Sequence, residues 1–460
     1  MKDHSNRPGK KPFRRSGGAP GSARPHRTDV RPGGFAPRPQ FEPQAEAPQQ
    51  AEDLGPETLD TIDPGKEALA ALPPDVPLVH LRSASYGAFI YNRMVGPVRG
   101  RPADGDIVAV ADRNERLFGW GFYNSRSMIQ LRMLTHLYQR PDEAELARRV
   151  IRAVSLRRQL LNLDQTTNAY RLIHAEGDGL SGLIADRFGE YVVLELFSLA
   201  WFQRLDMVQD AIIDAGLSVR NFIVRADKSV ADQEGFRTDR LSDNKDRETV
   251  ITENGVKFLI RMTKGHKTGF FCDQRENRLA LTKFTPGKNM LDICCYTGGF
   301  SCYAATLGKA AKVTAVDLDE KALEPAAENA KLNSAHIDFQ HADAFDYLRR
   351  AHADGRRWDV VVVDPSKFVP NRASMDMGLR KYADLNRLAA SVVAPGGIML
   401  TCSCSGLVDQ PTFVQTVGRA ARSAGRAMQI FRITGAAADH PVMADAPESA
   451  YLKAVWARLD

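Results

Sequence analysis

Short apolar runs separated by turn residues dominate the chain from about Val76 onward. Between residues 78 and 134, these runs are bounded by glycine, asparagine or serine, a pattern typical of strands in a small all-β module. The predicted strands cover residues 106–112, 117–123 and 128–133.

A helical pattern follows, from Asp142 to about Leu161. The arginines that cover much of its polar surface are Arg148, Arg149, Arg152, Arg157 and Arg158. An exposed structural face is the favoured interpretation, and RNA contact is the alternative. Strand-like runs at 191–196 and 222–225, with an amphipathic helix at 200–215 between them, then predict a small α/β segment.

From about Asn289 the pattern becomes strand–helix–strand with nearly continuous apolar strands. These strands lie at 290–293, 313–316, 360–363 and 398–401. Buried parallel strands have this character, so we expect a Rossmann-like, doubly wound parallel sheet. The predicted fold class is therefore α/β.

Composition narrows the class of protein. The 460 residues suffice for two or three domains, and 43% of them are hydrophobic. No apolar run reaches the length of a membrane span, and no apolar signal segment opens the chain, so a cytoplasmic protein is expected. Six cysteines fall between Cys272 and Cys404 in spacings that fit neither disulfides nor zinc, so we expect reduced thiols and no metal.

The net charge of +6 is unevenly distributed. Residues 1–40 hold ten Lys and Arg against two acids, with seven prolines and six glycines. Such a segment buries too little apolar surface to order itself, so we expect a disordered basic arm, followed by an acidic linker over about 42–63. A non-specific RNA tether and a solubilising tail both remain open as its role.

Acidic residues and a glycine turn follow the predicted core strands. Asp292 ends the first strand, and Asp317 ends the next one, twenty-five residues later. Between them Gly298 and Gly299 lead into a helix, where glycine lets a ligand approach the backbone closely. A carboxylate placed like Asp317 commonly accepts ribose hydroxyls. Asp343, after the third strand, is placed to meet an adenine amine.

Any one of these acids, taken singly, is more readily interpreted as a helix cap or a loop ion pair. Their order, strand by strand, indicates a pocket for a nucleoside cofactor. The turn lacks the GxGxxG spacing, so a dinucleotide with a pyrophosphate is disfavoured.

A carboxylate and a thiol follow the last two core strands. Asp364 and Cys404 should both face the cleft at the carboxyl edge of the sheet. A thiolate that adds to C6 of cytosine makes C5 nucleophilic enough to accept a methyl group, and Asp364 assists by bonding or protonating N3. A positive charge, from Lys367 or from a sulfonium, would raise the thiolate fraction. The alternative for Cys404 is a small buried apolar residue.

Several motifs carry a family resemblance. They are Lys264–Arg278, Cys295–Phe300, Asp364–Phe368, Ser403–Ser405, Ala438–Pro441 and Tyr451–Lys453. With them, nearly everything from about residue 78 to 460 resembles the bacterial large-subunit ribosomal RNA (cytosine-5)-methyltransferases that carry an N-terminal PUA domain.

The resemblance implies that the chain forms 5-methylcytosine in 23S ribosomal RNA with S-adenosylmethionine as cofactor. It places the nucleophile on Cys404 and the acid of motif IV on Asp364. The predicted cofactor-binding residues are Asp292, Tyr296, Thr297, Gly298, Gly299, Asp317, Asp343 and Asp364.

The resemblance also predicts the domains. We expect a disordered arm and linker at 1–75, an RNA-binding PUA domain at 76–140, a helical connector with a central α/β domain at 141–260, and the methyltransferase domain at 261–460. Ser181 and Ser366 stand where the family usually has proline, and residues 88–91 replace its usual Pro-Trp-Val-Phe run. Ser366 bears on base positioning, and the change at 88–91 bears on the RNA target.

Three basic residues are predicted RNA contacts. Lys267 and Arg275 lie in the segment 264–278, whose Phe270 and Phe271 would cover the cofactor or stack a base, and Lys367 follows Asp364. An ordered interdomain loop is the alternative for the segment.

Two other functions remain open. One is an enzyme of the same fold that methylates another base, such as a guanine nitrogen, with Cys404 merely structural. The other is a non-catalytic RNA-binding factor for ribosome assembly. The expected partner is ribosomal RNA or an assembly intermediate of the large subunit, and a homodimer is one open oligomeric state.

Overall fold

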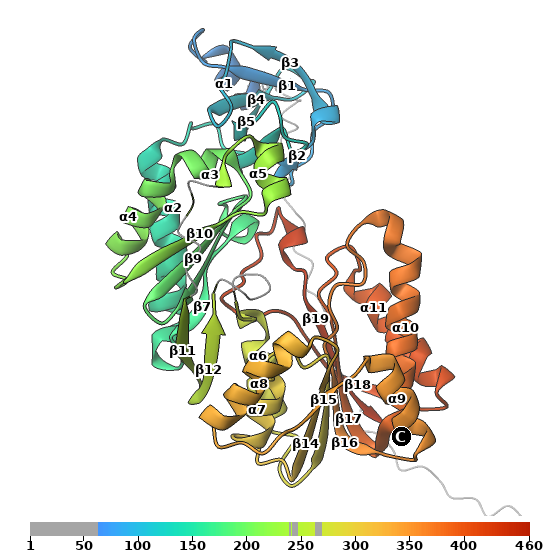
Figure 1. Cartoon of the computed structure of the whole chain (residues 1–460). Coiled ribbons are helices and arrows are strands. Elements are labelled where there is room, and N and C mark those ends of the chain that lie inside the picture. The colour runs from blue at the N-terminus through green and yellow to red at the C-terminus, as the bar shows by residue number, and fades with distance from the viewer. Residues whose placement is uncertain (1–62, 239–240, 242–246, 263–268) are drawn as a thin grey trace, which may run out of the picture. The chain divides into compact units, whose positions relative to one another are not determined.

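The structure is a computed structural model and describes residues 63–238, 241, 247–262 and 269–460. The predicted basic arm and nearly all of the linker lie outside the described residues. The described chain forms three larger β-sheets and one two-stranded hairpin, with helices packed against the sheets (Figure 1). Within the same ranges, no helix is both long enough and apolar enough to cross a membrane.

The first sheet has six strands in the order β2-β6-β5-β4-β1-β3. The strands are β1 (Leu78–Leu81), β2 (Phe89–Ile90), β3 (Val95–Arg99), β4 (Ile107–Ala111), β5 (Leu117–Tyr123) and β6 (Leu131–Thr135). Every residue of β4 and β5 is buried. The predicted all-β module is confirmed, and the strand predicted at 117–123 coincides with β5.

A short helix, α1 (Pro64–Ala70), precedes this sheet. Asp63 caps the helix and forms an ion pair with Arg116 at 2.6 Å. The apolar residues that pack against the core beneath the sheet are Ala68, Leu69 and Leu72. The predicted start of folded structure near Val76 is therefore wrong, because tertiary contacts order a helix too short and too polar to stand out in the sequence.

The second sheet has the order β10-β9-β8-β7 and is followed by a separate hairpin. Its strands are β7 (Ala169–His174), β8 (Leu183–Phe188), β9 (Tyr191–Leu196) and β10 (Asn221–Arg225), and the hairpin is β11 (Glu248–Glu253) and β12 (Val256–Arg261). The helices are α2 (Glu143–Ser155), α3 (Leu199–Gln203), α4 (Leu205–Asp214) and α5 (Lys228–Glu234). The predicted α/β segment is confirmed, with a break at Arg204 dividing the helix predicted at 200–215.

The arginines on and after α2 divide between surface and interior. Arg148 and Arg152 reach Glu145 on the surface. Arg157 is fully buried and donates to the two carboxylate oxygens of Asp178 at 2.7 and 2.9 Å. The predicted exposed face is therefore wrong for Arg157, whose buried ion pair joins the end of this helical segment to the loop after β7.

The third sheet has the order β15-β14-β13-β16-β17-β19-β18. Its strands are β13 (Asn289–Ile293), β14 (Lys312–Asp317), β15 (Asp338–His341), β16 (Trp358–Val363), β17 (Val393–Ser403), β18 (Met428–Thr434) and β19 (Lys453–Leu459). Its helices are α6 (Arg275–Leu281), α7 (Gly299–Ala305), α8 (Glu320–Leu332), α9 (Ala344–Ala353), α10 (Met375–Val392) and α11 (Gln410–Ser423). Figure 1 shows α6, α7 and α8 on one face of this sheet and α9, α10 and α11 on the other.

Strands β13 to β17 are parallel, whereas β19 runs antiparallel to both β17 and β18. The predicted doubly wound sheet is confirmed. The strand order reverses between β13 and β16, and ligands bind outside the carboxyl ends of the strands at such a switch point. The loops after these two strands therefore flank the expected site.

Candidate active site

The turn after β13 has an unusual backbone. Cys294, Tyr296 and Gly298 have φ values of 62°, 48° and 75°, in the left-handed region that favours glycine. The Tyr296 N–H donates to Oδ2 of Asp317 at 2.7 Å, while Oδ1 of Asp317 accepts from the Asp319 N–H at 2.9 Å. Two backbone amides thus orient the carboxylate of Asp317 at the end of β14.

Glycine matters at two positions of this turn. Gly298 is the N-cap residue of α7 and has a positive φ. A Cβ on Gly299 would lie 3.2 Å from Cδ of Arg278, so the backbone packs closely on a buried side chain. Thr297, between this pair and Tyr296, is buried, and its carbonyl accepts from Asn329 at 3.0 Å. The turn is therefore fixed by close packing of its glycines against neighbouring side chains and by the hydrogen bond from Asn329.

Asp292 lies beneath the turn. Its Oδ2 accepts from the N–H and the hydroxyl of Ser301, at 3.1 and 2.6 Å. Burial raises the pKa of this carboxyl to about 7. Its Oδ1 is buried and has no hydrogen-bond partner among the described residues. Asp292 therefore anchors the start of α7 and keeps one oxygen available for a polar group.

The four predicted acids come together around Cys294. Burial first, and then the negative charges of Asp317, Asp364, Asp292 and Asp343, raise the pKa of its thiol. Asp343 also caps α9, with Oδ1 accepting from the backbone N–H of the helix. The structure thus brings together carboxylates that are far apart in sequence, and their combined charge favours a cationic ligand.

Asp364 begins the loop after β16. Its N–H donates to the carbonyl of Ile293 at 3.2 Å, which ties this loop to the end of β13. Gln274 Nε2 donates to Oδ2 of Asp364 at 3.0 Å. Gln274 is buried, and its Oε1 accepts from Asn277 at 2.7 Å, so the amide is itself held in place.

Cys404 is half-buried between two fully buried serines. Tyr382, on α10, bonds the hydroxyls of Ser403 and Ser405, each at 3.0 Å. The Val369 N–H donates to the Ser405 hydroxyl at 3.1 Å. The two serines therefore fix the loop that carries Cys404 and link it to the loop that carries Asp364.

A lysine lies next to this loop. Lys453 begins β19, opposite Ser403 in the strand register. It is 5% exposed, and its Nζ donates to the carbonyls of Ser405 at 2.6 Å and Tyr451 at 2.9 Å. Lys453 belongs to the motif 451–453, but the sequence alone predicted no role for it. A lysine at the head of a buried apolar strand was the signal that could have found it.

Gln274 was also missed by sequence analysis, although it belongs to the segment 264–278. An amide carries no charge or reactivity that would single it out in a sequence. Only the fold shows that it faces Asp364.

The predicted RNA contacts have different surroundings. Lys267 lies outside the described residues, and Lys367 is exposed. Arg275 is 3% exposed and forms an ion pair with the fully buried Asp439 at 2.8 Å. Asp439 also accepts from the backbone N–H of Arg171 at 2.9 Å, so Arg275 joins the second and third sheets. The guanidinium of Arg275 is therefore engaged inside the protein and is not exposed for the predicted RNA contact.

The two serines that stand where the family usually has proline lie in different surroundings. Ser366 is exposed beside Asp364. Ser181 is buried, and its hydroxyl donates to Glu176 at 2.9 Å. That hydrogen bond stabilises a loop in which proline could not donate.

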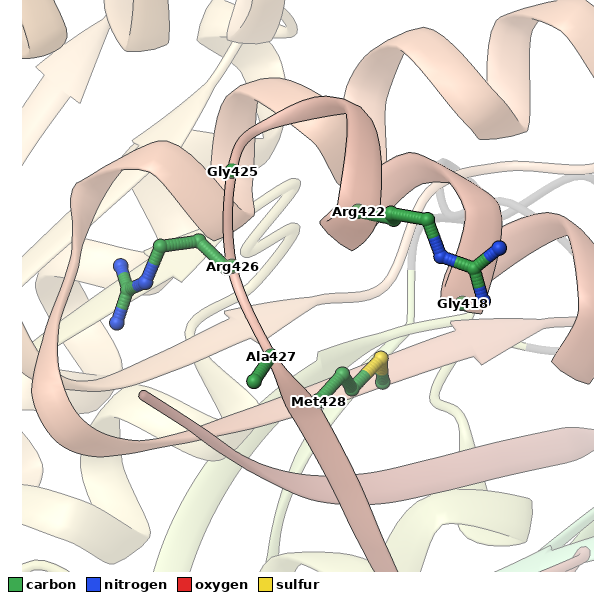
Figure 2. Close-up of a pocket in the computed structure, with 6 residues that line it drawn as sticks. All are labelled: Gly418, Arg422, Gly425, Arg426, Ala427 and Met428. Carbon is green, nitrogen blue, oxygen red and sulfur yellow. The ribbon is translucent and has the colours of Figure 1, made fainter. Parts of the chain in front are cut away.

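A surface pocket lies away from these residues. It is lined by Gly418, Arg422, Gly425, Arg426, Ala427 and Met428, as Figure 2 shows. Met428 pairs with Leu459, at the opposite end of β19 from Lys453. Arg426 donates to the carbonyls of Ala390 and Val393, so it serves the fold. Over the described ranges, no group of three or more His, Cys, Asp or Glu residues is arranged to hold a metal ion.

Comparison with known proteins identifies the family. A family model for S-adenosylmethionine-dependent methyltransferases matches residues 171–458, and one for PUA-like domains matches residues 88–136. The chain is 37% identical over 378 residues to ribosomal RNA large subunit methyltransferase I of Aeromonas hydrophila, covering 80% of this chain and 94% of that protein. It is 36% identical over 369 residues to the protein of the same name from Shewanella frigidimarina, covering 78% and 92%.

The fold has relatives among solved structures. A candidate SAM-dependent methyltransferase from Streptococcus mutans matches with a TM-score of 0.69 at 18% identity, over 83% of this chain and 99% of that chain. A second solved methyltransferase, complexed with SAH, matches with a TM-score of 0.68 over the same shares. The sequence matches carry the assignment, and these structures agree with the fold. The chain belongs to the S-adenosylmethionine-dependent methyltransferases, with S-adenosylmethionine as its cofactor and a PUA-like domain ahead of the methyltransferase domain.

Proposed function

We propose that this protein methylates C5 of a cytosine in large-subunit ribosomal RNA through a covalent adduct with Cys404. The observation that carries the proposal is the link between the loops of Asp364 and Cys404, made by the hydrogen bond from Val369 to Ser405 at 3.1 Å. The names of the curated relatives support large-subunit ribosomal RNA as the substrate.

The cofactor would lie at the switch point between β13 and β16. Asp317 would accept the ribose hydroxyls, Asp343 would lie near the adenine, and the turn 296–299 would pack against the ligand. The orphaned oxygen of Asp292 and the surplus of carboxylates suit a ligand that carries a sulfonium and an ammonium group. Bound S-adenosylmethionine supplies an electrophilic methyl group.

Cys404 acts first in the proposed reaction. Its thiolate forms a bond to C6 of the cytosine, and the electron pair of the C5–C6 double bond becomes available at C5. C5 then takes the methyl group, whose bond to the sulfonium sulfur breaks so that the cofactor would leave as the neutral thioether S-adenosylhomocysteine. A base removes the C5 proton, the C5–C6 double bond re-forms, and the C6–S bond breaks so that the thiolate leaves.

Asp364 assists at the opposite side of the ring. Its carboxyl group bonds N3, which draws electron density away from C6 as the thiolate approaches. Gln274 holds Oδ2 of this carboxyl group, so the acid keeps one orientation while the base enters. The base must leave its stack to reach this position.

RNA binding would extend beyond the site. The PUA-like domain, for which we propose the limits 76–140, would hold the RNA, and the exposed Lys367 would contact phosphate near the flipped base. For the central and methyltransferase domains we propose the limits 141–260 and 261–460.

The test is methyl transfer from labelled S-adenosylmethionine to ribosomal RNA, with nucleoside analysis of the product. Wild type should form 5-methylcytosine, and Cys404→Ala should form none while Cys302→Ala, a change at a buried cysteine on α7, stays active. A methylated guanine, or full activity in Cys404→Ala, would overturn the proposal. RNA binding without transfer would favour an assembly factor.

A further inference from the structure

Lys453 carries a buried positive charge, and none of the acids in the described part of the chain forms an ion pair with it. Its ammonium donates to two carbonyl oxygens. Removing a charge from water is costly unless an opposite charge or a hydrogen-bond network compensates for it. Two neutral carbonyls offset only part of this cost, so we expect a further interaction to stabilise the ammonium at this position.

The neighbours of Lys453 in the sheet indicate which interaction this is. β19 runs beside β17, and Lys453 lies opposite Ser403, the residue before Cys404. The hydrogen bond from Nζ to the Ser405 carbonyl brings the ammonium to the residue after Cys404. Lys453 therefore lies beside the three-residue frame Ser403–Ser405, paired with its first residue in the strand register and hydrogen-bonded to its last.

We propose that Lys453 is a positioning residue that holds Cys404 as a thiolate by pairing its ammonium with the sulfur. This inference rests on the proposed role of Cys404 as the nucleophile. It replaces the two cations that the sequence suggested, Lys367 and a sulfonium, with a residue built into the sheet.

The charges around the pair are mixed. Burial lowers the pKa of Lys453 to about 8, with the Lys367 charge acting in the same direction, while Cys404 and Asp409 raise it. On the side of Cys404 lie Tyr382, Cys402 and Asp364, which share charge interactions within the same cluster. Thiol and ammonium therefore titrate as a coupled pair, and the ion pair exists over the range in which the ammonium keeps its proton while the thiol has lost its own.

The test measures the rate at which iodoacetamide alkylates Cys404 between pH 5.5 and pH 10, read by mass spectrometry of the Cys404 peptide. In wild type the midpoint should lie below the value of about 8.5 for an ordinary thiol. Lys453→Met should move the midpoint up by about one unit and lower the rate at pH 7 about tenfold. Lys453→Arg should restore much of the rate, and Lys331→Met, at an exposed lysine, should change nothing.

Several outcomes would overturn the pair. One is a wild-type midpoint at or above about 8.5, which needs no variant at all. Another is a wild-type profile in a folded Lys453→Met protein, or in Lys453→Gln if the Met variant does not fold. An unchanged alkylation profile together with Cys404-dependent 5-methylcytosine formation would overturn the Lys453–Cys404 pair but support the proposed function. A shifted alkylation profile together with another methylated base would support the pair but overturn the proposed function.

Discussion

Gln274 donates a hydrogen bond to Oδ2 of Asp364 across 3.0 Å, and the direction of that bond is fixed by its neighbours. Asn277 donates to Oε1 of Gln274, and Thr434 donates to Oδ1 of Asn277, each at 2.7 Å. The amide of Gln274 can therefore present only its N–H to the acid. A carboxyl group held at one oxygen keeps its orientation toward the cleft.

Gln274→Met should lower kcat for methyl transfer about tenfold or more, because the loss of a buried hydrogen bond to the acid costs roughly 1–3 kcal/mol. Methionine has a similar size, so the fold should remain. Steady-state kinetics with labelled cofactor check the change, with the exposed Gln429→Met as the matched control. Equal kcat in Gln274→Met and wild type would show that the amide is structural.

Tyr382→Phe should slow methyl transfer while the protein stays folded. The variant removes the hydroxyl that bonds Ser403 and Ser405, and thus loosens the loop of Cys404 without emptying the core. We expect kcat to fall about tenfold, with a change in the free energy of unfolding of roughly 1–2 kcal/mol. Urea denaturation and kinetics on the same sample separate the two effects; a stability loss with unchanged kcat would contradict this.

Glu253→Gln should destabilise the protein by about 3–5 kcal/mol, because it leaves the buried charge of Arg278 unpaired. Arg278 donates to both oxygens of Glu253, at 2.7 and 2.9 Å, and packs under Gly299. Cofactor binding should weaken as well. Chemical denaturation and calorimetric titration with S-adenosylmethionine measure the two effects.

The matched control is Glu328→Gln, which removes a charge that pairs with Arg261 at the surface. Exposed pairs contribute about 0–1 kcal/mol, so this variant should stay close to wild type. Similar losses in both variants would show that burial does not set the strength of the Glu253 pair.

Asp292→Asn should change how stability depends on pH. Burial raises the folded-state pKa of Asp292 to about 7 from 3.8, so its stabilising contribution is full below 3.8 and is lost as the pH rises through about 7. The Asn variant cannot titrate and should lose less stability than wild type over that range. Thermal unfolding at a series of pH values measures the difference; parallel curves would mean that Asp292 titrates normally.

The sequence predicted the centre of the third sheet well because β13, β14 and β16 are almost entirely buried. The runs at 290–293, 313–316 and 360–363 all lie within β13, β14 and β16. It did not predict that β17 begins as early as Val393, because Pro395 and two glycines interrupt the apolar run there. Helix α1 was missed for a related reason, since contacts distant in sequence order it.

At the candidate site, the order of residues along the chain was enough to predict the charged and reactive side chains. It did not predict the side chains that hold them in place. Asp317, Asp364 and Cys404 could be found because each follows a core strand. Gln274 precedes these three residues in the chain and Lys453 follows them, yet both lie at the same site. No sequence spacing relates either residue to Cys404. Arg275 was predicted to contact RNA because it is charged. In the fold, however, its side chain forms an ion pair with Asp439.

The order of strands in the third sheet also constrains how the protein assembles during synthesis. β19 lies between β17 and β18 but leaves the ribosome after both. Until it inserts, β17 has an open edge that can pair with other chains, and β18 has no partner strand in the sheet. The same insertion delivers Lys453 to the Cys404 loop, so a nascent chain with unprotected edges also lacks the charge that we propose activates its thiol. The insertion of β19 would then both complete the sheet and activate the thiol of Cys404.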